Sequence, residues 1–311
     1  MAFSGVAQSQ TKQQRTKKRF RGFGRDYVES FIVRSGVFWV SLLPWGCALF
    51  ISRTLAYCFY WLVPRRRQIA LDNLEIAYGA QKTRQEKNKL VITSFQNLIL
   101  SVYELFTTEK IIPQAQNKFQ LEGVEHLEKA FSKGKGIVFA ISHLGAWEYL
   151  GFLPYLTQFP CSVISRAIRN PYLNAHVHRM RQATGLQNIL KENSVRKILS
   201  ELKQNHLVAI LIDQWAGKDG LTSTFFGLET STTSIPARLA HRTQAAIVPG
   251  YCLRLPGGNY KILIRPEVPV DKDPNDWECK TTEILNRYLE SEILKYPEQW
   301  IWTHRRWKKI N

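Results

Sequence analysis

The chain is poor in cysteine and lacks the short motifs that mark common cofactor and metal sites. Its 311 residues include five cysteines, an odd number, widely scattered and without a Cys-x-x-Cys pair. This argues against a disulfide framework and a structural zinc site, and it suits a reducing compartment. Neither Gly-x-Gly-x-x-Gly nor the Walker phosphate loop occurs, and no His, Cys and Asp side chains stand at metal-ligand spacing. We therefore expect no cofactor and no metal.

Acidic residues are scarce relative to basic ones, at 25 against 43, which gives a formal net charge of +18. Such an excess predicts anionic partners: lipid headgroups, nucleic acid or an acidic carrier protein. Phosphate neutralisation would account for the charge, but the sequence has no helix-turn-helix, zinc-finger or RNA-binding signature. We expect no nucleic-acid partner, and a non-catalytic basic membrane- or nucleic-acid-binding protein remains the remote alternative.

Charged residues are missing altogether from one stretch near the N-terminus. Residues 1–30 are polar and basic and predict a disordered tail, whereas Ser35–Ser52 holds 18 residues without a charge. That length is at the lower limit for a membrane span, and Pro44 would kink or break a helix there. Tryptophans and tyrosines of the type found at membrane interfaces are frequent here. We predict a membrane anchor over residues 31–63, either a kinked span or an interfacial anchor; the alternative is a buried hairpin.

Residues 64–311 show the alternating pattern of an α/β domain. Apolar residues at three- and four-residue steps predict helix over 68–108, and short apolar runs further along predict strands separated by helices. The predicted strands are Ile137–Ser142, Ser162–Arg166, Leu207–Asp213, Ala246–Leu253 and Lys261–Pro266, and the predicted helices are 147–157, 171–184, 194–204, 234–242 and Thr281–Tyr296. This pattern favours an α/β sandwich whose strand ends carry the chemistry.

The most informative pair of residues is His143 and Glu148, which follow the first of these strands. A histidine has a pKa suited to a general base, and a carboxylate on its second ring nitrogen would fix its tautomer. Five positions apart on one continuous helix, the two would not face each other. They can meet only if the chain turns after the strand, and Gly145 stands where such a turn needs it.

Further blocks share their order and spacing with a known family. They are Pro64–Arg67, Asn73–Leu74, Ala77–Tyr78, Ser165–Pro171, Asp213–Gln214, Phe225–Gly227, Ile235–Ala240, Val248–Pro249 and Trp300–Lys308. From about Phe38 to Trp307, the chain resembles the bacterial lipid A biosynthesis acyltransferases, the late lauroyl and myristoyl transferases. These are related to phosphatidylinositol mannoside acyltransferases, within the lysophospholipid acyltransferase-like superfamily. One departure is Ser165–Ala167, where family members often carry Tyr-Arg-Pro.

The resemblance implies a glycerolipid acyltransferase-like α/β sandwich and an O-acyltransferase. The enzyme would move a fatty acyl chain from an acyl thioester to a hydroxyl of a lipid A precursor or related anionic glycolipid. It favours acyl carrier protein over coenzyme A as donor, and it implies the inner (cytoplasmic) membrane, with the catalytic domain on the cytoplasmic side. The alternative is a glycerophospholipid acyltransferase, although that broader family usually has Asp where this chain has Glu148.

In this interpretation, His143 takes the acceptor proton and Glu148 holds the imidazolium; no covalent intermediate is required. Substrate-binding roles fall on residues of the family blocks, several of which have a plainer alternative. Arg166 would contact a phosphate or the developing oxyanion, or else is a solvated surface arginine. Asn170 and Gln214 are assigned to substrate binding within the same blocks. Asp213 would position Arg166 or an acceptor hydroxyl, or else cap a helix or turn. Phe225 and Phe226 would form a wall of an acyl channel, or else belong to the core, and Arg238 would bind phosphate, or else pair with a carboxylate.

Overall fold

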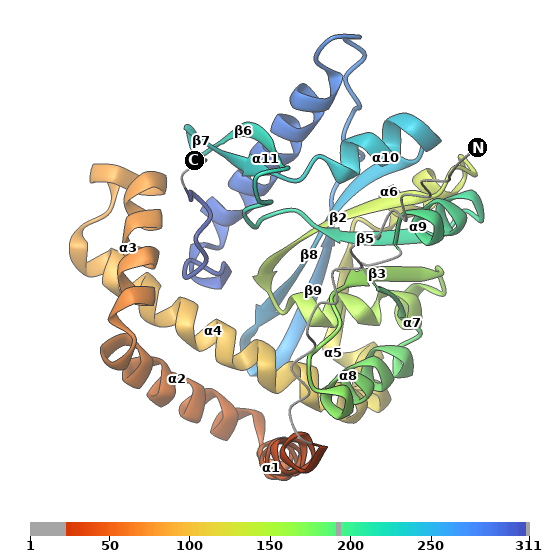
Figure 1. Ribbon diagram of the computed structural model, residues 1–311. Helices are drawn as coiled ribbons and strands as arrows, with labels where there is room; N and C mark the ends of the chain where they lie inside the picture. Colours follow the sequence, from red (N-terminus) through yellow and green to blue (C-terminus); the bar gives the residue numbers. More distant parts are fainter. Residues whose placement is uncertain (1–22, 191–193, 309–311) are drawn as a thin grey trace, which may run out of the picture.

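A central seven-stranded sheet organises the computed structural model, which describes residues 23–190 and 194–308 (Figure 1). The strand order is β1-β9-β8-β2-β5-β3-β4, and a separate two-stranded hairpin is formed by β6 and β7. The strands are β1 Phe119–Glu122, β2 Ile137–Gly145, β3 Cys161–Ser165, β4 Gln187–Leu190, β5 Leu207–Leu211, β6 Leu221–Phe225, β7 Leu228–Thr232, β8 Ala246–Leu255 and β9 Asn259–Ile264.

Five neighbouring strands, from β8 to β4, run parallel, and only the β8–β9 pairing in this sheet is antiparallel among the described residues. Their carboxyl ends therefore lie along one edge, where an open α/β sheet places its binding site. The helices are α3 Pro64–Tyr78, α4 Arg84–Ile111, α5 Ala115–Lys118, α6 Val124–Phe131, α7 Leu153–Thr157, α8 Pro171–Ala183, α9 Ser194–Lys203, α10 Ile235–Thr243 and α11 Trp277–Lys295.

Each face of the sheet has its own hydrophobic core, and the residues of β2 divide between them. Val138, Ala140 and Leu144 pack into the core that includes α3, α9 and α11, whereas Phe139 and Ile141 pack into the core that includes α6 and α7. Alternation along a strand sends successive side chains to opposite faces, so a strand buried on both faces is apolar throughout. The predicted mixed α/β architecture is confirmed.

Two differences between the predicted and the observed elements have a local physical cause. The helix predicted over 68–108 is two helices, because Gly79 adopts a φ of +47° and Thr83 begins α4 with a capping box to Glu86. Four strands were not predicted. The edge strands β1 and β4 have only four residues each, and the β6–β7 hairpin is rich in Ser and Thr, so none of the four stands out as an apolar run.

Two helices precede the sheet domain: α1 Phe23–Leu42 and α2 Trp45–Leu62. Pro44 separates them, as predicted from its fixed φ and missing N–H. The first helix begins inside the range predicted as a disordered tail; residues 1–22 lie outside the described part of the chain. The segment Trp45–Leu62 meets Pro64–Gln81 at a bend of 96°, so this pair is not one straight span.

Membrane anchoring by residues 31–63 stays a prediction. By length and composition, Arg84–Lys118 is also apolar enough to cross a membrane, but 44% of that window is buried inside the protein. By contrast, α1 and α2 lie at one corner of the molecule and expose many large apolar side chains (Figure 1). We call these the N-terminal apolar face: Tyr27, Val28, Phe31, Ile32, Phe38, Trp39, Leu42, Leu49, Phe50, Ile51, Leu55, Tyr57, Phe59, Trp61 and Leu62.

Candidate active site

The parallel register of β2 and β5 places His143 beside Asp213. Ile137 pairs with Leu207 and Ile141 with Leu211, so two residues further along both strands the same register brings the histidine and the aspartate together. The His143 Nδ1 atom lies 2.9 Å from Asp213 Oδ1. Beyond them the chain turns at Gly145, whose φ is +66° and whose missing Cβ would collide with the backbone oxygen of β8.

Asp213 is buried and accepts hydrogen bonds from three donors. Besides the His143 ring, the backbone N–H of His143 donates to Oδ2 at 3.0 Å, and the Trp300 indole Nε1 donates to the same oxygen at 3.0 Å. A carboxylate already accepting from two other donors acts as an acceptor here too, so Nδ1 of His143 carries its proton toward Asp213. That tautomer leaves Nε2 with the free lone pair that a general base requires.

Burial and charge act in opposite directions on this pair. Burial disfavours the charged imidazolium, but the Asp213 charge and hydrogen bond, with a smaller contribution from Glu148, outweigh it, so the pKa of His143 is raised from its ordinary value. Burial alone would raise the pKa of Asp213, yet His143 and the other donors lower it to about 2. At neutral pH, Asp213 is therefore an anion fixed against the histidine.

Glu148 does not make the contact that the sequence predicted. Its carboxylate accepts from Arg181, with Nη2 at 3.0 Å from both oxygens and Nε at 3.3 Å from Oε2. The physical reason is the turn itself: Trp147–Phe152 is a 3-10 segment that directs Glu148 toward α8, which carries Arg181. Among the described residues, the carboxylate that orients the His143 ring is Asp213 instead.

An apolar cavity lies on the face of the sheet that carries Phe139 and Ile141, and one of its wall residues, Trp147, contacts His143. Its walls come mainly from β2, β3, β5 and the 3-10 segment Trp147–Phe152, and the ion pair of Glu148 with Arg181 supplies its polar part. The Trp147 ring contacts the His143 ring edge-on, with centroids 5.1 Å apart. The lining residues are Phe139, Ile141, Trp147, Glu148, Leu150, Gly151, Cys161, Val163, Ile164, Ser165, Arg181, Leu186, Ala209 and Leu211.

Other predicted site residues fall at varying distances from this centre. Gln214 lies at it, with its amide nitrogen 3.4 Å from His143 Nε2 and 3.5 Å from Nδ1. Arg166 is exposed just after β3, next to Ser165 of the cavity wall. Asn170 is buried and caps α8, because its side-chain oxygen accepts from two backbone N–H groups of the first turn.

The last three predicted residues have structural surroundings. Phe225 is fully buried, and Phe226 packs against the same core; neither lines the cavity described above. Phe226 also donates its backbone N–H to a carboxylate on α11. Arg238 is exposed and pairs with Glu278 at 2.7 Å, which is the plainer of its two predicted roles.

Two residues that contact the candidate site, Arg181 and Trp300, were given no site role by the sequence analysis. Arg181 lies in the last turn of α8, within a basic stretch of sequence, and had no signal of its own. Trp300 begins the C-terminal segment, Trp300–Lys308, which returns to the sheet and forms an antiparallel bridge with Leu144. That segment stood out in the sequence as a block, but its position beside His143 depends on tertiary folding. The contact between His143 and Asp213 had a detectable signal in the sequence. Each of the two residues ends an apolar run, and these two runs form neighbouring strands that begin at paired positions.

The sequence matches known acyltransferases along most of its length. A family model described as bacterial lipid A biosynthesis acyltransferase matches residues 16–309. The chain is 26% identical over 281 residues to the lipid A biosynthesis palmitoleoyltransferase of Escherichia coli strain K12, covering 88% of this chain and 89% of that protein. It is 25% identical over 281 residues to the lipid A biosynthesis lauroyltransferase of the same strain, with the same coverage.

A more distant similarity extends beyond lipid A enzymes. The phosphatidylinositol mannoside acyltransferase of Mycolicibacterium smegmatis is 24% identical over 188 residues, which cover 59% of this chain and 60% of that protein. The relatives thus share acyl transfer to a glycolipid as the activity in their names, while the glycolipid differs between them.

Proposed function

Because the chain belongs to the bacterial lipid A biosynthesis acyltransferase family and is thereby an O-acyltransferase, we propose that it transfers a fatty acyl chain from acyl carrier protein to a lipid A precursor. The acceptor would be a hydroxyl group of this anionic glycolipid. The observation that supports the proposal best is the juxtaposition of a carboxylate-held histidine with an apolar cavity. A basic chain of net charge +18 also suits an acidic carrier protein and an anionic acceptor.

In the proposed reaction, His143 acts as the general base through Nε2. It removes the proton from the acceptor hydroxyl while that oxygen attacks the thioester carbonyl carbon. Collapse of the tetrahedral intermediate breaks the carbon–sulfur bond, and the imidazolium returns its proton to the leaving thiolate. Asp213 stabilises the transient imidazolium and keeps the ring oriented, a function that the sequence had assigned to Glu148.

The cavity would hold the acyl chain of the donor. Its walls are aliphatic and aromatic side chains of three strands, which suits a hydrocarbon chain and offers it few hydrogen bonds. Glu148 and Arg181 lie at the cavity as a neutralised pair, so we assign Glu148 a positioning role: it holds Arg181 and adds negative potential near His143. Gln214 and Arg166 would contact the acceptor or the oxyanion.

We further propose that the enzyme works at the inner membrane, with its catalytic domain on the cytoplasmic side. A lipid acceptor has to be reached in a bilayer, and the N-terminal apolar face would bury in it. Coenzyme A in place of the carrier protein would leave this arrangement unchanged, since the acyl thioester is the same.

The test compares acceptors and a base variant in one assay. Wild type and His143→Ala are given acyl carrier protein loaded with a labelled acyl chain, together with a phosphorylated disaccharide lipid or with lysophosphatidic acid. We expect transfer to the disaccharide lipid and its loss in His143→Ala, with folding and membrane association retained. Equal or better transfer to the lysophospholipid would favour a glycerophospholipid acyltransferase. A folded alanine variant with full activity would remove His143 from the mechanism.

A further inference from the structure

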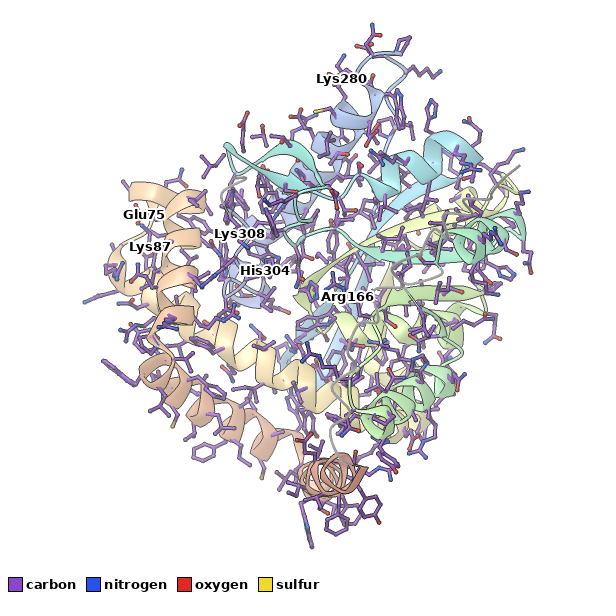
Figure 2. The ribbon with its side chains drawn as sticks, viewed as in Figure 1. Glu75, Lys87, Arg166, Lys280, His304 and Lys308 are labelled. Atoms are coloured by element: carbon purple, nitrogen blue, oxygen red, sulfur yellow. The ribbon has the colours of Figure 1, made fainter. Side chains whose placement is uncertain are left out.

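The C-terminal segment carries polar groups that the proposed acyl transfer leaves unused. It begins at Trp300, whose indole holds Asp213, so the residues after it start beside His143. Asn73 on α3 donates its amide to the backbone oxygens of Trp302 and His304, at 2.7 Å each. These bonds fix the course of the backbone along the segment, and Figure 2 shows His304 and Lys308 together between α3 and the sheet.

Three basic side chains of this region form no direct ion pair in the part of the chain that the structure describes. Within the described residues, Arg66, Arg306 and Lys308 take part in no ion pair with an acidic side chain. Arg306 is fully buried; its two terminal nitrogens donate to the backbone oxygen of Ser231 and the hydroxyl of Thr232, at 2.7 Å each. Burial lowers the pKa of Arg306 to about 10, so it remains charged at neutral pH. The carboxylates of Asp213 and Glu290 act on Arg306 electrostatically but form no ion pair with it, so a directly bound anion would pair this buried charge.

Three side-chain nitrogens in the same region are buried and lack a hydrogen-bond partner within the described structure: Trp215 Nε1, His304 Nδ1 and Arg306 Nε. The Lys308 ammonium group stands over the Trp215 ring, 4.6 Å from its centroid. Burial, with the nearby cations, lowers the pKa of His304 to about 4, so this ring is neutral and able to donate. Leaving a buried polar group without a hydrogen bond is unfavourable, so each such group requires an explanation, and a bound ligand that completes the hydrogen bonds is one.

The Arg66 side chain brings α3 to the same place. Its Nη1 donates to the backbone oxygen of Thr303 at 3.2 Å, which holds the guanidinium against the C-terminal segment while the side chain remains exposed. Arg66 and Lys308 thus supply accessible cations, and Arg306 supplies a buried one behind them. Trp215 and His304 add neutral donors, a combination that matches an oxyanion with several acceptor atoms.

We propose that Arg66, Trp215, His304, Arg306 and Lys308 form a binding site for a phosphate group of a substrate, next to His143. A phosphate offers several acceptor oxygens and at least one negative charge. It could therefore form an ion pair with the cations and accept hydrogen bonds from the unsatisfied donors. Two sources share this chemistry: a phosphate on the acceptor glycolipid and the phosphopantetheine of the donor. Only this choice of sources rests on the proposed function; the site itself rests on the side chains.

The experiment measures the binding of phosphorylated probes to the protein by calorimetry, independently of acyl transfer. The probes are a phosphorylated glucosamine disaccharide and phosphopantetheine, each compared with its dephosphorylated counterpart. We expect wild type to prefer one phosphorylated probe at least tenfold, and Arg66→Gln combined with Lys308→Gln to abolish that preference. Tenfold corresponds to about 1.4 kcal/mol. Trp215→Phe, which removes the indole N–H but keeps an aromatic ring under the Lys308 ammonium group, should weaken the preference less. The probe that shows the effect identifies the source of the phosphate.

The matched control removes two positive charges elsewhere, with Lys280→Gln at a partly exposed position and Arg242→Gln at an exposed one, and should keep the preference. Figure 2 shows Lys280 far from His304 and Lys308. The site is overturned if wild type prefers neither phosphorylated probe, or if the Arg66 and Lys308 double variant binds as the control does. Acyl transfer is assayed on the same preparations. Intact phosphate binding without any transfer would overturn the proposed function and leave the site standing.

Discussion

At the scale of single residues, the Asp213 carboxylate, which accepts a hydrogen bond from His143, determines the pKa and the orientation of the proposed base. Asp213 raises the pKa of His143 against the effect of burial, so the neutral, active form of the histidine appears only as pH rises through a value above 6.5. In Asp213→Asn, burial acts without this opposition, and the acidic limb of the kcat/KM profile should move to lower pH. The maximum should fall by roughly 10²–10⁴-fold, because the amide no longer stabilises the imidazolium or fixes its tautomer.

A pH–rate profile of wild type and Asp213→Asn measures both effects together. Asp219→Asn is the matched control, since it makes the same chemical change at an exposed turn and should leave the profile as it is. A variant whose acidic limb stays in place would show that Asp213 does not set the pKa of the base.

A second residue-scale prediction concerns the depth of the cavity. Ala209 on β5 lines it and is buried, so Ala209→Leu would fill part of the space with three further carbons. The variant should shift its preference toward shorter acyl chains, measured by competition between acyl carrier donors of graded length. Ala140→Leu crowds the opposite face of the sheet and serves as the control, because its effect on packing should lower stability without changing the preferred length. An unchanged preference in Ala209→Leu would separate this cavity from the acyl chain.

At the scale of elements, α4 is tied to β8 by a buried ion pair. Arg254 on β8 bonds both oxygens of Glu104 on α4, at 2.7 Å each, and also reaches Asn97 and Ser101 on the same helix. Removing one partner leaves the other charge buried and uncompensated. Arg254→Ala should therefore lower the free energy of unfolding by about 3–5 kcal/mol.

Denaturant titration measures this loss. The control is Lys261→Ala, which breaks a more exposed pair with Glu122 and should cost at most about 1 kcal/mol. Similar losses in the two variants would mean that the α4–β8 pair contributes no more than a surface contact.

Elements also mark the limit of what the sequence could predict. Long apolar runs gave β2, β5 and β8, and local breakers such as Pro44 gave helix ends, because these signals are contained within a few residues. The pairing of His143 with Asp213 depends on which strand lies next to β2, a property of the folded sheet. Sequence spacing assigned Glu148 to the histidine. In the structure Glu148 pairs with Arg181, which lies on a helix 33 residues further along the chain.

At the scale of the whole molecule, the N-terminal apolar face and the active site have to serve one lipid substrate. We predict that replacing Trp39, Phe50 and Trp61 together by glutamine weakens binding to vesicles of anionic lipid. Burying such a side chain contributes roughly 1.5–3 kcal/mol, so the three together should lower the partition coefficient by more than about a hundredfold. All three side chains are at least 67% exposed, so the substitutions should leave the fold intact.

Vesicle flotation measures the effect, against a control in which Leu190, Leu228 and Leu294 are replaced by glutamine. These leucines are also exposed but lie outside α1 and α2, so their loss should leave binding unchanged. Extraction with alkaline carbonate then separates the two forms of anchoring. Release of the intact protein would fit an interfacial anchor formed by the bent helices, whereas retention would fit a span. Equal binding by both triple variants would show that the membrane is contacted elsewhere, and the basic surface would then have to carry the attachment through anionic headgroups.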